Sequence, residues 1–146
     1  MKRVVENRIF ATCSPDEFVG RETEVARLLD QANGSGGLAM LCEPSAGASE
    51  LLRQVYDRLF TGGGEVVPFY FEIKLSDADG KSIATRFVRE FLLQTVAFRR
   101  SDKKILDSSP EICELAELAV PADGYWIDRL VETCNTDSRF SDDSSF

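Results

Sequence analysis

The residues best suited to bind a ligand lie in a turn of small side chains that precedes a helical pattern. The turn runs from Pro44 to Gly47, and Ser49 stands at the start of the helical pattern. The first backbone N–H groups of a helix have no acceptor within the helix, and the helix dipole adds a partial positive charge there. Such a helix start attracts phosphate, and a hydroxyl group beside it can contact Mg²⁺. We therefore expect this turn to bind the phosphate groups of a nucleotide.

Two of the four defining positions of a phosphate loop are kept in this segment. The pattern is a glycine, four residues, a second glycine, a lysine and then a serine or threonine, and it follows a buried strand. Gly47 and Ser49 match it, but Cys42 replaces the first glycine and Ala48 replaces the lysine. Loss of a charge-assisted contact costs about 1.5–3 kcal/mol of binding free energy, so we expect weak binding. A fixed cation such as the missing lysine also stabilises the negative charge on the phosphoryl group in the transition state of its transfer. Because this cation is absent, we expect no hydrolysis by this chain.

A second motif lies upstream of the loop. The segment Phe18–Glu24 reads Phe-Val-Gly-Arg-Glu-Thr-Glu and is followed by Leu28. Together with the loop, it resembles the N-terminal box and phosphate loop of AAA+ and STAND ATPases. The resemblance implies ATP and Mg²⁺ as cofactors, with the box backbone near the adenine and Ser49 near Mg²⁺. The residues that it places at the cofactor are Val19, Gly20, Arg21, Pro44, Ser45, Ala46, Gly47, Ala48, Ser49 and Glu50.

The chain departs from that family in the loop and beyond it. Ser45 stands where a glycine is common, in addition to the changes at Cys42 and Ala48. We find no later run of four apolar residues that ends in the acidic pair of a Walker B element, which holds Mg²⁺ and orients water. The nearest segments are 69–72 and 125–128, and the helical spacing of the second indicates core packing. We therefore expect a degenerate domain that holds only the front part of such an ATPase.

The elements that must position these residues follow from hydrophobic periodicity and from Gly and Pro breaks. Apolar residues three or four apart predict helices, and short apolar, β-branched or aromatic runs predict strands. A strand, a helix and a second strand in this order indicate a parallel βαβ unit. The expected fold class is α/β, an incomplete three-layer α/β/α P-loop domain that is rich in helix and has two parallel strands. We expect helices over 21–32, 49–60, 82–99, 110–119 and from 123, and strands over 38–41 and 66–73.

The expected domain organisation follows from the same reading. We expect an N-terminal extension over 1–17, the truncated ATPase-like domain over 18–134 and a polar tail over 135–146. In sheets of this family the first two strands are not neighbours, so the strand over 38–41 would have no partner in its own chain. Unpaired backbone groups are costly when buried, so we expect a loosely packed or aggregation-prone chain.

Composition narrows the classes of function. The formal net charge of -8 argues against binding to nucleic acid or to an anionic membrane surface. The absence of histidine removes the Ser/His/Asp and Cys/His nucleophile arrangements and every zinc site that contains histidine. The four cysteines form no CxxC pair, so we expect reduced thiols. We find no signal peptide and no apolar run near the roughly 20 residues of a membrane span, so we expect a cytoplasmic protein.

The expected partners are a nucleotide and either another protein or the remainder of the ATPase domain, with no nucleic acid and no membrane. One alternative stays open. In this alternative the chain is a pseudo-ATPase, a regulatory or scaffold segment that binds no nucleotide and uses its helical face over 83–98 to bind a protein partner.

Overall fold

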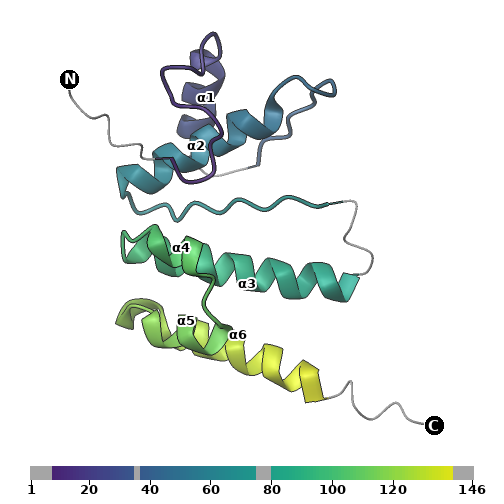
Figure 1. The fold of residues 1–146 in the computed structure, drawn as a ribbon, viewed down its shortest axis with the longest axis vertical. Coiled ribbons are helices and arrows are strands. Elements are labelled where there is room, and N and C mark those ends of the chain that lie inside the picture. Colours follow the sequence, from purple (N-terminus) through teal and green to yellow (C-terminus); the bar gives the residue numbers. More distant parts are fainter. Residues whose placement is uncertain (1–7, 35–36, 75–79, 140–146) are drawn as a thin grey trace. The chain divides into compact units, whose positions relative to one another are not determined.

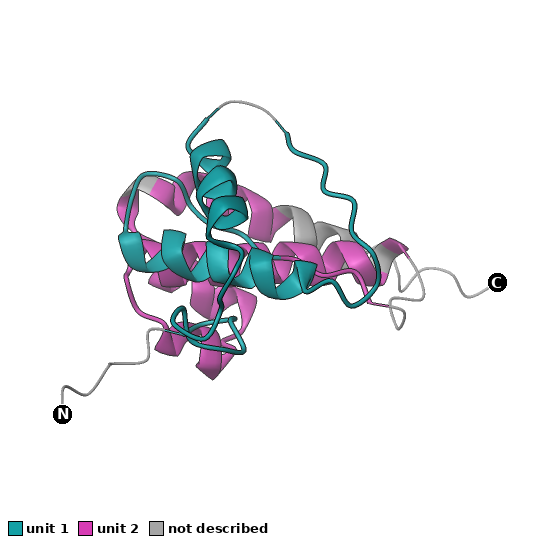
Figure 2. Cartoon of the chain, turned by 90° about the horizontal axis from the view of Figure 1, so that it is seen from above, with its two compact units in different colours: residues 1–70 teal, residues 71–146 magenta. Residues whose placement is uncertain are grey.

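The computed structural model describes residues 8–34, 37–74 and 80–139, and the regular secondary structure within these ranges is helical (Figure 1). The chain divides into two compact units, residues 1–70 and 71–146, which are described separately (Figure 2). The helices are α1 (Glu22–Ala32), α2 (Ala48–Gly62), α3 (Gly80–Arg99), α4 (Lys104–Ser108), α5 (Ile112–Leu118) and α6 (Pro121–Arg139).

The expected helices are confirmed with small shifts of their ends. Helix α2 begins after Gly47 and ends before Gly63, and both flanking glycines have left-handed backbone conformations, with φ of 75° and 62°. A side chain at either position would be strained, so the two glycines define the limits of this helix. Helix α4 was not expected, and α6 continues to Arg139, inside the range predicted to be a polar tail.

The prediction of an α/β fold with two parallel strands is wrong for the described part of the chain. Residues 38–41 and 66–73 are not helical, yet they form no strand pairing among the described residues. The side chain of Leu41 is 100% exposed and that of Ile73 is 73% exposed, whereas a central strand would bury both. The hydrophobic pattern reports the tendency of a segment to extend, but a sheet also requires a neighbouring strand to pair with its N–H and C=O groups. A three-layer P-loop domain is therefore not the fold of this structure.

Helices α1 and α2 form the core of the first unit. Val25, Leu51 and Val55 are buried together, and Phe18, Leu28, Leu29 and Leu59 pack against them. Burial of each such aliphatic side chain contributes about 1.5–3 kcal/mol to folding. Residues four apart lie on the same face of a helix, so the contact between Val25 and Leu51 also brings the starts of the two helices, Arg21 and Gly47, toward each other.

The second unit consists of α3, which packs against α4 and α5, and of α6, which packs against α5. Leu92 to Phe98 in α3 are buried, together with Leu115 and Ile127. Arg99 forms an ion pair with Asp123, with a distance of 3.1 Å between Nε and Oδ2. Part of the C-terminal half of the helical face over 83–98 therefore packs within its own unit, and binding of a partner by this face stays a prediction. Segment 125–128 lies within α6, so it is not a strand with an acidic end.

No helix in the described ranges is both long enough and apolar enough to cross a membrane.

Candidate functional site

The loop before α2 is an exposed turn that leads directly into the helix. The amide of Ala46 donates to the carbonyl of Glu43 at 3.1 Å, which closes a turn around Pro44 and Ser45. Ser45 has a φ of 68° and Gly47 a φ of 75°, both left-handed. Alternation of left- and right-handed residues turns successive amides toward one side, as in the concave anion sites formed by backbone N–H groups.

The first amides of α2 are open to a ligand. The first helical bond runs from the amide of Leu51 to the carbonyl of Gly47 at 3.0 Å. Within the described residues, the amides of Ala48, Ser49 and Glu50 have no hydrogen-bond acceptor, and no side chain caps this helix start. Ser49 is exposed. The start of α2 therefore keeps the partial positive charge that attracts an anion.

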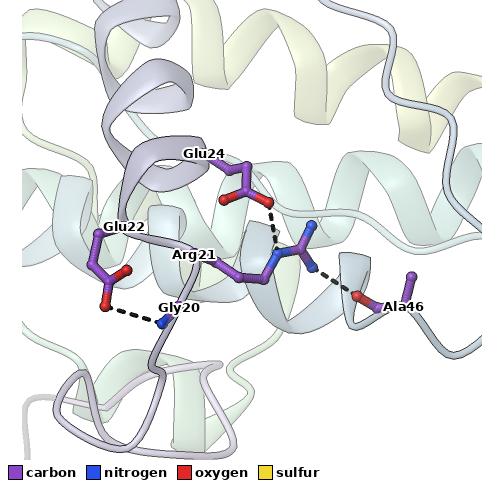
Figure 3. Close-up of polar contacts among 5 residues, drawn as sticks. All are labelled: Gly20, Arg21, Glu22, Glu24 and Ala46. Carbon is purple, nitrogen blue, oxygen red and sulfur yellow. Dashed lines mark hydrogen bonds and ion pairs between the residues drawn. The ribbon is translucent and has the colours of Figure 1, made fainter.

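Arg21 reaches this loop from the start of α1. Its Nη1 donates to the carbonyl of Ala46 at 2.7 Å, although the two residues are 25 positions apart in the sequence (Figure 3). Its Nε contacts Oε1 of Glu24 at 3.0 Å, so the guanidinium is held from both sides. A Cβ built on Gly47 would lie 3.6 Å from Nη1. A cation therefore stands next to the loop in which Ala48 replaces the lysine.

Gly20 and Val19, the other two box residues that the resemblance places at the cofactor, have different surroundings. The amide of Gly20 donates to Oε1 of Glu22 at 3.1 Å (Figure 3). The amides of Glu22 and Gly20 lower the pKa of the Glu22 carboxyl, because both donate to its charged form. Val19 is 76% exposed. The structure thus brings Arg21 to the loop, and the placement of Val19 and Gly20 near a base stays a prediction.

Glu50 faces its own chain instead of the loop. Its carboxylate accepts hydrogen bonds from the amide of Thr12 at 3.0 Å, the hydroxyl of Thr12 at 2.6 Å and the side-chain amide of Gln54 at 3.1 Å. The amide of Cys13 also donates to it, at 3.4 Å. Desolvation raises the pKa of Glu50, but the hydrogen bonds from Thr12, Gln54 and Cys13 outweigh it and lower the pKa to about 2. This carboxylate is therefore charged at neutral pH, and Thr12, Cys13 and Gln54 already donate to its oxygens.

Asp57 holds the adjoining part of the same N-terminal segment. Its two oxygens accept the amides of Ile9 at 2.8 Å, Phe10 at 2.9 Å and Ala11 at 3.2 Å. The ring of Phe10 lies 4.7 Å from that of Tyr56. We call residues 9–13 the strap. Sequence reasoning missed it because the segment has no periodic pattern, although the row of polar residues at helical spacing on α2, Glu50, Gln54 and Asp57, was a signal that this face binds polar groups.

The described residues contain no group of three or more acidic, Cys or His side chains that could hold a metal ion. Mg²⁺ that accompanies a nucleotide keeps several waters and needs only one or two protein ligands. The exposed hydroxyl of Ser49 at the start of α2 fits that limited role. A Mg²⁺ ion at Ser49 would therefore take most of its ligands from water or from a bound molecule.

Comparison with protein-family models, with curated proteins and with solved structures gave no match for this chain. The function of this chain is therefore inferred from the geometry of its own residues.

Proposed function

We propose that the loop before α2 binds the phosphate groups of a nucleotide, and that ATP with Mg²⁺ is its ligand. The observation that carries the proposal is the contact at 2.7 Å between Nη1 of Arg21 and the carbonyl of Ala46, beside the exposed start of α2. It places a guanidinium, which also pairs with Glu24, beside a set of amides that lack acceptors among the described residues. The guanidinium and the amides both favour the binding of an anion, and both act at the start of α2.

Each part of the site has a defined role in this proposal. The amides of Ala48 and Ser49 donate to phosphate oxygens, and the hydroxyl of Ser49 contacts Mg²⁺. A guanidinium has more N–H donors than the two contacts to Ala46 and Glu24 use, so Arg21 can turn its remaining donors to the phosphates. Arg21 thereby supplies part of the charge that a lysine at position 48 would provide.

The expected affinity is low, because the site is exposed and has one fixed cation. We expect a dissociation constant of the order of 1 mM, which corresponds to about -4 kcal/mol of binding free energy. The test is a titration of the isotope-labelled chain with ATP and Mg²⁺, followed through the amide resonances of residues 46–50. Saturable shifts in these amides support the proposal, and a lack of saturable shifts up to about 10 mM nucleotide rejects it.

A second function, binding of a protein strand, is favoured by one observation. Residues 38–41 are apolar and lie outside the helices, and Leu38 and Leu41 are 46% and 100% exposed. Added strands bind such segments through main-chain hydrogen bonds. The first partner to test is a second copy of the chain. Slower hydrogen exchange at Ala39 and Met40 as the protein concentration rises, abolished by L41K, would support this function, and exchange that does not depend on concentration would exclude self-pairing.

A further inference from the structure

Glu50 occupies a position from which a glutamate commonly caps its own helix. It is the third residue of α2 after Gly47, the residue before the helix. At this position a glutamate side chain can reach back to the amide of the residue before the helix. Helix α5 shows this arrangement in the same chain, because Oε2 of Glu114 accepts the amide of Glu111 at 2.8 Å. In α2 the equivalent carboxylate is turned to Thr12 and Cys13 instead.

We infer that Glu50 has two alternative positions, and that it couples docking of the strap to the accessibility of the first amides of α2. With the strap docked, Thr12 and Cys13 occupy the carboxylate, and the start of α2 stays open. With the strap released, the carboxylate loses these donors and keeps the side-chain amide of Gln54 on Oε1, and the position of Glu50 in the first turn lets its other oxygen reach back to the amides of Gly47 and Ala48. The inference deepens the proposed function, because these amides lie where the phosphates would bind.

The released position would oppose an anion in two ways. Glu50 would occupy amide donors that a phosphate needs, and it would place a negative charge beside the remaining ones. The docked strap is therefore the state that permits binding, and its release closes the site without any movement of α2.

The strap has a second attachment that makes the coupling testable. Asp57 accepts the amides of Ile9, Phe10 and Ala11, and the ring of Tyr56 lies against the ring of Phe10. This attachment lies about two turns along α2 from Glu50. Removing the Phe10 ring loosens the strap and leaves Glu50 intact. Removing the Glu50 carboxylate loosens the strap too, but it also removes the group that would close the helix start. A purely structural role for Glu50 predicts the same consequence for both changes, whereas the coupling predicts opposite ones.

The experiment compares hydrogen exchange at the amides of Thr12 and Gly47 in the full chain and in F10A, E50A and F10A/E50A. In F10A we expect exchange at Thr12 to become faster and exchange at Gly47 to become slower by about fivefold, the size of a typical helix-capping effect. In E50A and in F10A/E50A we expect fast exchange at both amides. If F10A does not fold, D57N weakens the same attachment and replaces it.

The inference is overturned if exchange at Thr12 becomes faster in F10A while exchange at Gly47 stays unchanged. It is also overturned if exchange at Gly47 slows equally in F10A and in F10A/E50A. A second titration, with ATP and Mg²⁺, is expected to show about fivefold weaker binding in F10A and restored binding in F10A/E50A. If no variant binds the nucleotide, the proposed function fails and the exchange data alone decide the coupling. If the wild type binds and F10A binds equally, the coupling fails and the proposed function stands.

Discussion

Thr12 and Glu50, 38 positions apart in the sequence, are joined by hydrogen bonds from both the amide and the hydroxyl of Thr12 to the carboxylate of Glu50. The hydroxyl bond is the shorter, at 2.6 Å. This pair fastens an irregular segment to the first turn of α2, next to the loop proposed to bind phosphate. Its chemistry makes the attachment sensitive to acid and to small changes in either side chain.

The Glu50 attachment should weaken at low pH. The pKa of Glu50 is about 2 in the folded chain against an ordinary value of 4.5, so the charged form is favoured by folding. The stability that it contributes is complete above about pH 4.5 and is lost as the pH falls toward 2. Unfolding in denaturant, measured from pH 6 to 2 on the wild type and on E50Q, should show a smaller decrease in E50Q. Equal decreases of the free energy of unfolding in the wild type and in E50Q would show that Glu50 does not cause the loss of stability at low pH.

The Thr12 hydroxyl should stabilise the strap. We expect T12V to lower the free energy of unfolding by about 1 kcal/mol, because it removes a hydrogen bond to a charged acceptor while it keeps the shape of the side chain. T23V is the matched control, since Thr23 lies exposed on α1. Urea unfolding of both variants measures the difference. Equal stability of T12V and T23V would contradict the importance of this contact.

The core between α1 and α2 should depend on Leu51. This side chain is fully buried, and L51A should destabilise the chain by about 2–5 kcal/mol through lost burial and the cavity left behind. L52A is the control, because the neighbouring Leu52 is 41% exposed. Its expected effect is below about 1 kcal/mol. Thermal or urea unfolding distinguishes the two, and similar losses would mean that the contact between α1 and α2 is not the core of this unit.

Much of the helical structure could be predicted, because it depends on local pattern. Val25, Leu28 and Leu29 repeat at helical spacing and do face α2. The strands over 38–41 and 66–73 were predicted wrongly, because the formation of a strand depends on a partner that local sequence does not specify. Within the site, the turn and the helix start follow from Gly47 and the pattern after it. The strap could not be predicted, since its amides bind side chains 37 to 48 positions away.

The loop geometry should require glycine at position 47. Its φ of 75° is left-handed, so G47A should cost about 1 kcal/mol of stability and displace the first amides of α2. G62A is the matched control, because Gly62 lies in the last turn of α2 with open space around it and without a positive φ. Unfolding curves give the stability difference, and amide shifts at Ala48 and Ser49 report the loop. A G47A variant with wild-type stability and unshifted amides would show that the left-handed turn is not needed.

The role of Arg21 tests the central claim most directly, because the proposed phosphate site depends on its charge beside the start of α2. Titration with ATP and Mg²⁺ of the wild type, R21Q and R27Q compares this arginine with an exposed one on the same helix. We expect R27Q to bind like the wild type and R21Q to bind at least about tenfold more weakly, the loss of one charge-assisted contact. Saturable binding of equal strength in R21Q and R27Q would contradict the proposed site.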